Sequence, residues 1–334
     1  MITKVSKIDL QSLQEAKNLI ESEQLVAFPT ETVYGLGALA TSEKAIKSVY
    51  EVKGRPSDNP LIVHVHKDYD ISTLVYTSQN GYAKKIADAF LPGPLTMVYK
   101  SKGVVAPALS CGLDTLAIRI PQSAEAQEFL KFVNQPIAAP SANISKHISP
   151  VTAEHVYQDF NGKIPLVLDG GKCEGGIEST VLDVTGDIPV ILRKGLITAE
   201  MIREVVGSCV YAGENAQTSL KSPGMKYKHY SPNCETAVFE RNESEEAIEL
   251  YDKLKSEGKS VVFLCDDEML KKIGKRKFLA LGATDVEMAS NLYDLLHEGE
   301  KYEVIITFKL LVDSELMLSV NNRFSKAFFK DENK

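Results

Sequence analysis

The stretch that most constrains the fold of this chain is residues 53–64, KGRPSDNPLIVH, where a basic turn leads directly into an apolar strand. Pro56 and Pro60 fix φ and favour extended geometry in the residue before each of them, so they hold the turn open. Side-chain alternation along the strand places Val63 and His64 on opposite faces. A solvated loop with a stray basic pair is the alternative interpretation. The polar side chains placed to bind an anion are Lys53, Arg55, Asn59 and His64.

Apolar residues recur at helical spacing or alternate along most of the first 200 residues, which predicts a mixed α/β domain with many strands. Asp9 and Ser42 stand where they would cap the first two helices. Arg119 follows an alternating apolar pattern that leaves it on the face opposite the core. The expected helices span residues 10–20, 42–53, 81–91, 123–133, 152–160 and onward from 198, and the expected strands span residues 25–28, 63–66, 95–99, 116–120, 137–139, 165–168, 180–184 and 188–192.

The length of 334 residues exceeds the usual size of one hydrophobic core, so we expect two domains. The composition changes at residues 208–234, which are polar, contain Gly, Ser and Pro, and lack periodicity, as is typical of a linker. Strands and helices then alternate, which indicates a smaller, Rossmann-like domain with a parallel sheet. We therefore predict a first domain over residues 1–207, a linker over 208–234 and a C-terminal domain over 235–334.

Charge is unevenly distributed along the chain, whose net charge is −7. Residues 1–234 hold 23 Lys and Arg against 24 Asp and Glu, whereas residues 235–334 hold 15 against 21. The first part is the better host for anions. Neither part is basic enough to be assigned as a nucleic-acid binder on charge alone, because affinity for a polyanion comes largely from phosphate neutralisation.

The cysteines and the length of the apolar segments indicate the cellular compartment of the protein. The five cysteines are scattered and form no Cys-x-x-Cys pair, which argues against a disulfide framework or a zinc knuckle and fits reduced thiols. The chain has no run of about 18 apolar residues, and its N-terminus lacks the apolar core of a signal peptide. We expect a cytoplasmic protein with no membrane contact.

Two glycine-containing stretches fit phosphate-binding loops poorly. Residues 170–176, GGKCEGG, lack the Lys-Ser/Thr pair of a Walker loop. Residues 35–40, GLGALA, match a dinucleotide fingerprint, but six residues separate them from the preceding strand. A bound phosphate would therefore be neutralised by side chains, and Arg suits this because its planar fork binds phosphate or carboxylate bidentately. The candidate cations are Lys53, Arg55, Arg119, Arg193 and Lys194.

Short blocks spread over the chain form a recognisable set. Besides residues 53–64, they are PTETVYGLG at 29–37, PGPLT at 92–96, AIRIP at 117–121, APSAN at 139–143, ESTV at 178–181, LRKG at 192–195 and SPGMKYKHYSP at 222–232. In sequence and in order they resemble the threonylcarbamoyl-AMP synthase family of tRNA-modification enzymes. The last block resembles the interdomain linker of the two-domain members.

The resemblance implies a nucleotidyltransferase on a twisted open sheet, which joins L-threonine, bicarbonate and ATP into threonylcarbamoyl-AMP and pyrophosphate. This product serves the N6-threonylcarbamoyladenosine modification of tRNA through a downstream threonylcarbamoyl transferase. Mg²⁺ is expected with ATP, but its ligands are unknown because no acidic pair stands out. The implied catalytic residues are Lys53 and Arg55. The implied threonine site contains Thr32, His64, Arg119, Ala139 and Ser179. The implied ATP site contains Lys53, Arg55, Asn59, Thr115, Ser141, Asn143, Ser149 and Arg193, with Tyr227 or Tyr230 of the linker closing over the nucleotide.

The chain departs from the family pattern at Lys146, where the family usually has a glycine. Two other functions share the implied fold. A double-stranded RNA or tRNA-binding module without turnover would show a basic face, which the near-neutral charge of residues 1–234 disfavours. Carbamoyl transfer, as in hydrogenase maturation proteins, expects additional zinc-finger-like and acylphosphatase regions that this sequence lacks.

Overall fold

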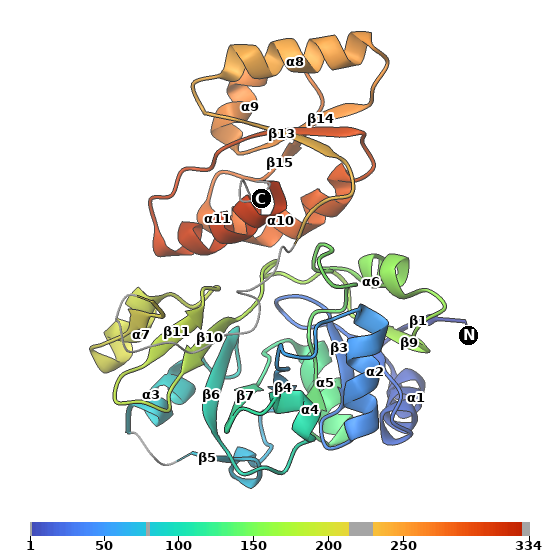
Figure 1. Ribbon diagram of the computed structural model, residues 1–334, viewed down its shortest axis with the longest axis vertical. Helices are drawn as coiled ribbons and strands as arrows, with labels where there is room; N and C mark the ends of the chain where they lie inside the picture. The colour runs from blue at the N-terminus through green and yellow to red at the C-terminus, as the bar shows by residue number, and fades with distance from the viewer. Residues whose placement is uncertain (1, 78–80, 214–229, 329–334) are drawn as a thin grey trace. The chain divides into compact units, whose positions relative to one another are not determined.

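The structure is a computed structural model that describes residues 2–77, 81–213 and 230–328. Its internal contacts divide the chain into two compact units, and Figure 1 colours the chain from blue at the N-terminus to red at the C-terminus. The first unit contains residues 1–145 and 149–227, and the second contains residues 146–148 and 228–334. None of the helices in the described ranges is long and apolar enough to cross a membrane.

The described strands of the first unit join in one mixed sheet. They are β1 (Lys4–Lys7), β2 (Val26–Phe28), β3 (Gly35–Leu39), β4 (Val63–His64), β5 (Val75–Tyr76), β6 (Leu95–Ser101), β7 (Thr115–Arg119), β8 (Ile137–Ala138), β9 (Leu166–Asp169), β10 (Thr180–Asp183), β11 (Val190–Arg193) and β12 (Val210–Tyr211). Their order is β1-β9-β2-β3-β8-β4-β7-β6-β10-β11-β12, and β5 pairs with β6 beside this path. The mixed α/β sheet expected from the sequence is therefore confirmed.

The helices of the first unit begin close to where the sequence predicts them. Asp9 caps the first, with its carboxylate accepting a hydrogen bond from the N–H of Ser12 at 2.8 Å, and Ser42 caps the second in the same way. The helices are α1 (Leu10–Glu21), α2 (Glu43–Lys53), α3 (Gly81–Phe90), α4 (Pro107–Ser110), α5 (Ala124–Val133), α6 (Ala153–Phe160) and α7 (Ala199–Val206), with a 3₁₀ turn at Ile71–Thr73.

The core of the first unit holds the sheet rigid beneath the predicted site. Helices α1 and α5 pack against each other and over β2, β8 and β9, where Leu13, Phe28 and Phe129 are buried. Burying such a side chain contributes roughly 1.5–3 kcal/mol. On β7, Leu116 and Ile118 are buried as the alternation predicts.

Two stretches for which no strand was predicted contain one in the structure. Residues 35–39, part of the weak dinucleotide fingerprint, form strand β3 and not a phosphate loop, because they pair with β2 and β8. The stretch predicted as a linker, residues 208–234, contributes β12 to the edge of the sheet. Its residues 214–229 lie outside the described part of the chain.

The second unit is a small parallel α/β domain, as predicted. Its sheet has the order β13-β16-β14-β15, and Figure 1 shows α8 and α9 on one face of this sheet and α10 and α11 on the other. The elements are β13 (Glu235–Phe239), α8 (Ser244–Ser256), β14 (Val261–Cys265), α9 (Asp267–Ile273), β15 (Phe278–Ala280), α10 (Asp285–Gly299), β16 (Val304–Phe308) and α11 (Glu315–Phe328). All five cysteines of the chain are free, as expected.

Candidate active site

A row of polar side chains crosses neighbouring strands of the large sheet. His64 on β4 and Thr96 on β6 are the register partners of Arg119 on β7, so the three side chains share one face. The hydroxyl of Ser179, the residue just before β10, lies 2.8 Å from that of Thr96. Arg193 on β11 then donates to Ser179. The fold thus brings together His64, Arg119, Ser179 and Arg193, which the sequence places far apart.

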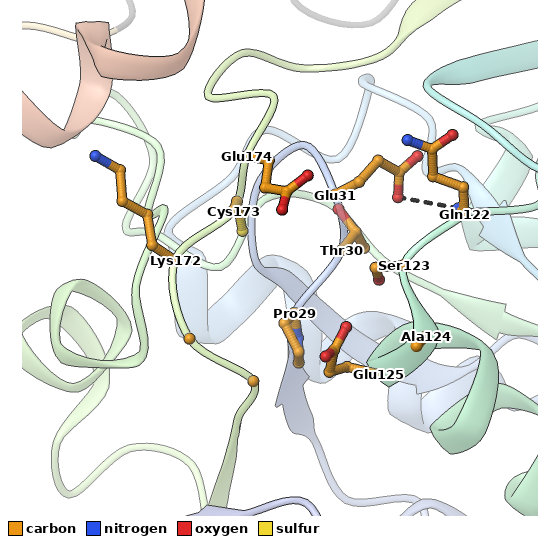
Figure 2. Close-up of a pocket in the computed structure, with 12 residues that line it drawn as sticks. Pro29, Thr30, Glu31, Gln122, Ser123, Ala124, Glu125, Lys172, Cys173 and Glu174 are labelled. Carbon is orange, nitrogen blue, oxygen red and sulfur yellow. Dashed lines mark hydrogen bonds between the residues drawn. The ribbon is translucent and has the colours of Figure 1, made fainter.

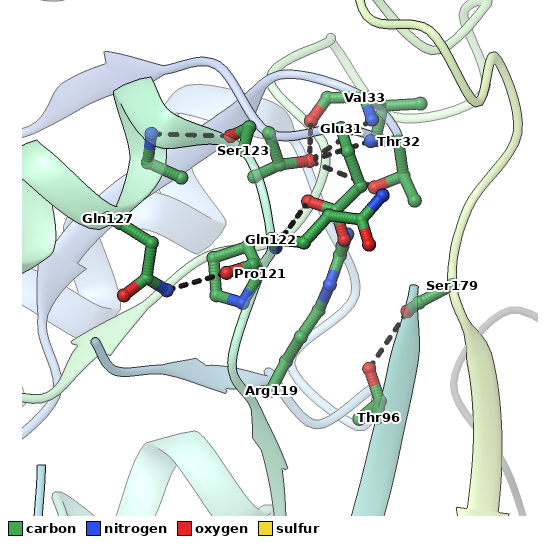
Figure 3. Close-up of polar contacts among 12 residues, drawn as sticks. Glu31, Thr32, Val33, Thr96, Arg119, Pro121, Gln122, Ser123, Gln127 and Ser179 are labelled. Atoms are coloured by element: carbon green, nitrogen blue, oxygen red, sulfur yellow. Dashed lines mark hydrogen bonds and ion pairs between the residues drawn. The ribbon is translucent and has the colours of Figure 1, made fainter. Parts of the chain in front are cut away.

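Thr32 lies in a tight turn between β2 and β3. The hydroxyl of Thr30 accepts hydrogen bonds from the N–H groups of Thr32 and Val33 and donates to the carbonyl of Val33 at 2.7 Å. A threonine hydroxyl commonly stabilises a turn in this way. Figure 3 shows Thr32 near the end of the Arg119 side chain, with the pair formed by Thr96 and Ser179 beside it.

Arg119 is buried and bonded to a carboxylate that the sequence analysis did not assign. Its NH2 group donates to Oε1 of Glu31 at 2.9 Å, and the two side chains are only 5% and 6% exposed. The other oxygen of Glu31 accepts from the N–H of Gln122 at 3.2 Å (Figure 3). Within the described part of the chain, Nε of Arg119 is buried without a hydrogen-bond partner. This guanidinium therefore has donor capacity left for a ligand.

His64 is held in its neutral form. Burial, reinforced by the charges of Arg119 and Arg193, lowers the pKa of His64 to about 3. Its Nδ1 lies 3.3 Å from the carbonyl of Ile62, which can only accept, so Nδ1 carries the proton and Nε2 is left as an acceptor. The ring also packs edge-on against Phe28. His66, to which the sequence analysis assigned no role, is bonded to the side chain of Asn134.

Lys53 is buried at the end of α2, and its ammonium group lies among backbone carbonyls. It donates to the carbonyl of Ser141 at 2.5 Å and to that of Asn143. Burial lowers the pKa of Lys53 well below its usual range. Lys53 therefore fixes the loop that carries two other predicted ATP-site residues, Ser141 and Asn143.

Arg55 folds back over its own turn. Its guanidinium donates to the carbonyls of Asn59 and Pro60, both at the long distance of 3.3 Å. The side-chain oxygen of Asn59 is buried and has no hydrogen-bond partner within the described residues. Long, weak bonds and an unsatisfied amide oxygen indicate a turn that can exchange internal contacts for a ligand.

Two further predicted ATP-site residues are Ser149 and Thr115. The hydroxyl of Ser149 donates to the carboxylate of Glu178 at 2.9 Å, and both residues are buried. Thr115 lies at the opposite end of β7 from Arg119, where it lines a mainly apolar cavity of about 60 Å³ together with Pro60.

The remaining predicted contacts are a backbone group and two tyrosines. The N–H of Ala139 donates to the carbonyl of Ile62 at 2.9 Å. Tyr227 lies outside the described residues. Tyr230 is described in the second unit, where it is buried with its ring centroid 5.1 Å from that of Tyr293.

A polar cavity of about 440 Å³ borders the turn that carries Thr32 (Figure 2). Glu31, Glu125 and Glu174 contribute carboxylates to its lining, and Ser123 contributes the cap of α5. None of these residues was a sequence-based candidate. Glu31 belongs to the block PTETVYGLG, but nothing in the sequence indicated that its side chain pairs with Arg119.

Comparisons with known proteins agree on one group of relatives. The family model described as "Telomere recombination" (Sua5, YciO and YrdC) matches residues 18–195, and the model described as "Threonylcarbamoyl-AMP synthase, C-terminal domain" matches residues 197–328. The threonylcarbamoyl-AMP synthase of Pyrococcus abyssi is 41% identical over 96% of this chain and 95% of its own length. That of Bacillus subtilis is 39% identical over 94% and 92%.

The solved structures point the same way. The crystal structure of P. abyssi Sua5 complexed with L-threonine superposes with a TM-score of 0.83 at 38% identity, covering 98% of this chain and 96% of that one. A doubly substituted variant of the same P. abyssi protein gives a TM-score of 0.84 over the same shares of the two chains.

Proposed function

This chain belongs to the two-domain form of the threonylcarbamoyl-AMP synthase family, and on that premise we propose that it joins L-threonine, bicarbonate and ATP into threonylcarbamoyl-AMP and pyrophosphate. It is a nucleotidyltransferase of tRNA processing. The observation that carries the proposal is the set of polar side chains that begins with His64 and Arg119 on one face of the sheet and continues through Ser179 to Arg193. Binding of L-threonine by the P. abyssi relative, whose fold this chain shares, supports it.

The threonine site lies at Arg119. A substrate carboxylate would accept from the unused donors of this guanidinium, with a charge-assisted contact of about 1.5–3 kcal/mol. Thr32 and Ser179 carry hydroxyls for the polar end of the side chain. His64, neutral and with Nε2 as acceptor, suits an ammonium or hydroxyl donor. Ala139 contributes its carbonyl.

The ATP site lies between the 55–59 turn and β11. Arg55 and Arg193 would neutralise phosphate charge, and the amide oxygen of Asn59 can accept from a donor of the nucleotide. Ser141 and Asn143 are presented by the loop that Lys53 fixes. Thr115 and Ser149 complete the set, and Tyr227 or Tyr230 would cover the nucleotide.

The reaction requires two anions to approach each other. The threonine amine takes up bicarbonate to give a carbamate with loss of water, a carbamate oxygen attacks the α-phosphorus, and pyrophosphate leaves. Positioning and cationic side chains therefore matter more than a general base. We propose that Mg²⁺ is carried on the phosphates of ATP, as is usual for this ion at nucleotide sites. The described residues include no group of three or more His, Cys, Asp or Glu that could hold a metal.

Pyrophosphate release tests this function. With ATP and Mg²⁺, we expect release that requires both threonine and bicarbonate, together with threonylcarbamoyl-AMP detected by mass spectrometry. Binding of tRNA without such turnover would favour the RNA-binding alternative. We further propose a cytoplasmic enzyme that supplies a downstream tRNA threonylcarbamoyl transferase.

A further inference from the structure

Glu31 has no role in the site proposed above, yet it is bonded to the guanidinium assigned to the threonine carboxylate. We propose that Glu31 is a positioning residue for threonine recognition, which fixes Arg119 so that the remaining guanidinium donors face the substrate carboxylate. This inference rests on the proposed function, since it takes Arg119 as the threonine ligand.

Glu31 is fixed by three hydrogen bonds. Its Oε1 accepts from Arg119 at 2.9 Å and its Oε2 accepts from the N–H of Gln122 at 3.2 Å. The carbonyl of Glu31 accepts from the N–H of Gly175 at 2.7 Å. A side chain at position 175 would meet this carbonyl, because a Cβ there would lie 2.9 Å from its oxygen. Glu31 therefore has little freedom, and Arg119 is held by a fixed partner.

This arrangement uses only some of the hydrogen-bond donors of the Arg119 guanidinium. One terminal nitrogen is bonded to Glu31, whereas the buried Nε has no hydrogen-bond partner within the described residues. Buried guanidinium donors are rarely left unbonded in folded proteins, so an unbonded one in a site points to an acceptor supplied by a ligand. A carboxylate matches the fork of two adjacent guanidinium N–H groups. Glu31 thus occupies one side of Arg119 and leaves the other for the substrate.

Only a carboxylate at position 31 can do this. Both of its oxygens accept, one from Arg119 and the other from a backbone N–H. The amide of a glutamine has a single acceptor oxygen, so its NH₂ group would face one of these two donors. The substitution Glu31→Gln changes little in volume and therefore isolates the loss of the second acceptor.

The test compares two ligands that differ only at the carboxylate. L-Threoninol carries a CH₂OH group in place of the carboxylate of L-threonine. For Glu31→Gln we expect the affinity for threonine to fall by about tenfold, the loss of one charge-assisted bond, while the affinity for threoninol and the KM for ATP change by less than about twofold. Asp252→Asn, which breaks the surface ion pair with Arg276 in the second unit, is the matched control and should change none of these.

Each other outcome overturns the inference. Equal losses for threonine and threoninol, with a lower melting temperature, would give Glu31 a structural role only. Unchanged or tighter threonine binding would show that Glu31 does not orient Arg119 or that it competes with the substrate. Equal affinity of the wild-type protein for threonine and threoninol would show that Arg119 does not bind the substrate carboxylate. The proposed function is tested separately by threonine-dependent pyrophosphate release from the wild-type chain, which can succeed when this inference fails.

Discussion

Arg193 donates hydrogen bonds from Nε and NH2 to the carbonyl of Ser179, at 3.2 and 3.0 Å, and from NH2 to the Ser179 hydroxyl at 3.2 Å. The sequence assigns Ser179 to threonine and Arg193 to ATP. The two proposed subsites therefore meet at one contact. During the reaction the carbamate attacks the α-phosphate, and the two anions repel each other most strongly as they meet. A cation at this junction can approach both anions and reduce that repulsion.

We predict that Arg193→Ala raises the KM for both substrates. The KM for ATP should rise about tenfold because a charge-assisted contact is lost, and the KM for threonine should rise several-fold because Ser179 loses one of its two hydrogen-bonded neighbours, Thr96 being the other. Steady-state pyrophosphate release measures both constants. Arg203→Ala on α7, which removes an exposed arginine, is the control. A change confined to ATP would show that the contact with Ser179 does not serve threonine.

Lys53→Met should lower the stability of the protein. The substitution keeps the apolar stem but leaves the carbonyls of Ser141 and Asn143 without their donor, and each unsatisfied buried carbonyl costs about 1–3 kcal/mol. We expect the free energy of unfolding in urea to fall by about 2–4 kcal/mol. No loss of stability would mean that Lys53 is free to leave the carbonyls for the phosphates of ATP.

Arg55→Ala, two residues away, should behave in the opposite way. The contacts that its guanidinium makes with the carbonyls of Asn59 and Pro60 are long, so we expect its removal to change the free energy of unfolding by less than about 1 kcal/mol. The affinity for ATP should fall by about tenfold or more, as measured by titration calorimetry. Equal losses of stability and affinity in this variant would mark Arg55 as structural.

The sequence predicts most of the first unit because its elements carry strong patterns. Helix α1 has the cap at Asp9 and a regular apolar face, so its bounds are found almost to the residue. Helix α11 escaped prediction, because its buried side includes Ser319 and Arg323, which interrupt the apolar pattern. Elements as short as β15 contain too few residues for any periodicity to show.

The sequence predicted which residues belong to the site, but it did not predict the hydrogen bonds that they form with one another. The partners of Arg119 and of Lys53 are distant along the chain, at separations of 88 to 90 positions, and no local pattern reports such pairings. The charges of both cations, set in blocks that resemble the family, therefore suggested that both face a ligand. In the structure Arg119 is shared with Glu31, and Lys53 lies on backbone carbonyls. Burial and pairing, which need the fold, separate these two cases.

Lys146→Gly should stabilise the protein. Lys146 has a φ of 80°, in the left-handed region that a glycine adopts without strain and that a side chain makes costly. Glycine adopts this backbone without strain, so the substitution places a residue that fits it. We expect the free energy of unfolding to rise by about 1 kcal/mol, less the extra entropy that glycine adds to the unfolded chain. A decrease would mean that the Lys146 side chain contributes more than its backbone strain costs.

The protonation of His64 should make stability depend on pH. Burial, with the nearby charges of Arg119 and Arg193, lowers its pKa from 6.5 to about 3 in the folded protein. Between these values the unfolded chain binds a proton that the folded chain does not, so stability falls as the pH falls through this window and is constant, for this group, above it. At pH 5 the loss is about 2 kcal/mol relative to pH 7.5.

Urea unfolding of the wild type and of His64→Gln at pH 7.5 and pH 5 measures this effect. Other titrating groups contribute equally to both proteins, so the difference between their pH-dependent losses isolates His64. We expect the wild type to lose about 2 kcal/mol more than the variant between the two pH values. If the two losses were equal, the imidazole would accept a proton in the folded protein as readily as in the unfolded chain, which would contradict a pKa lowered by burial.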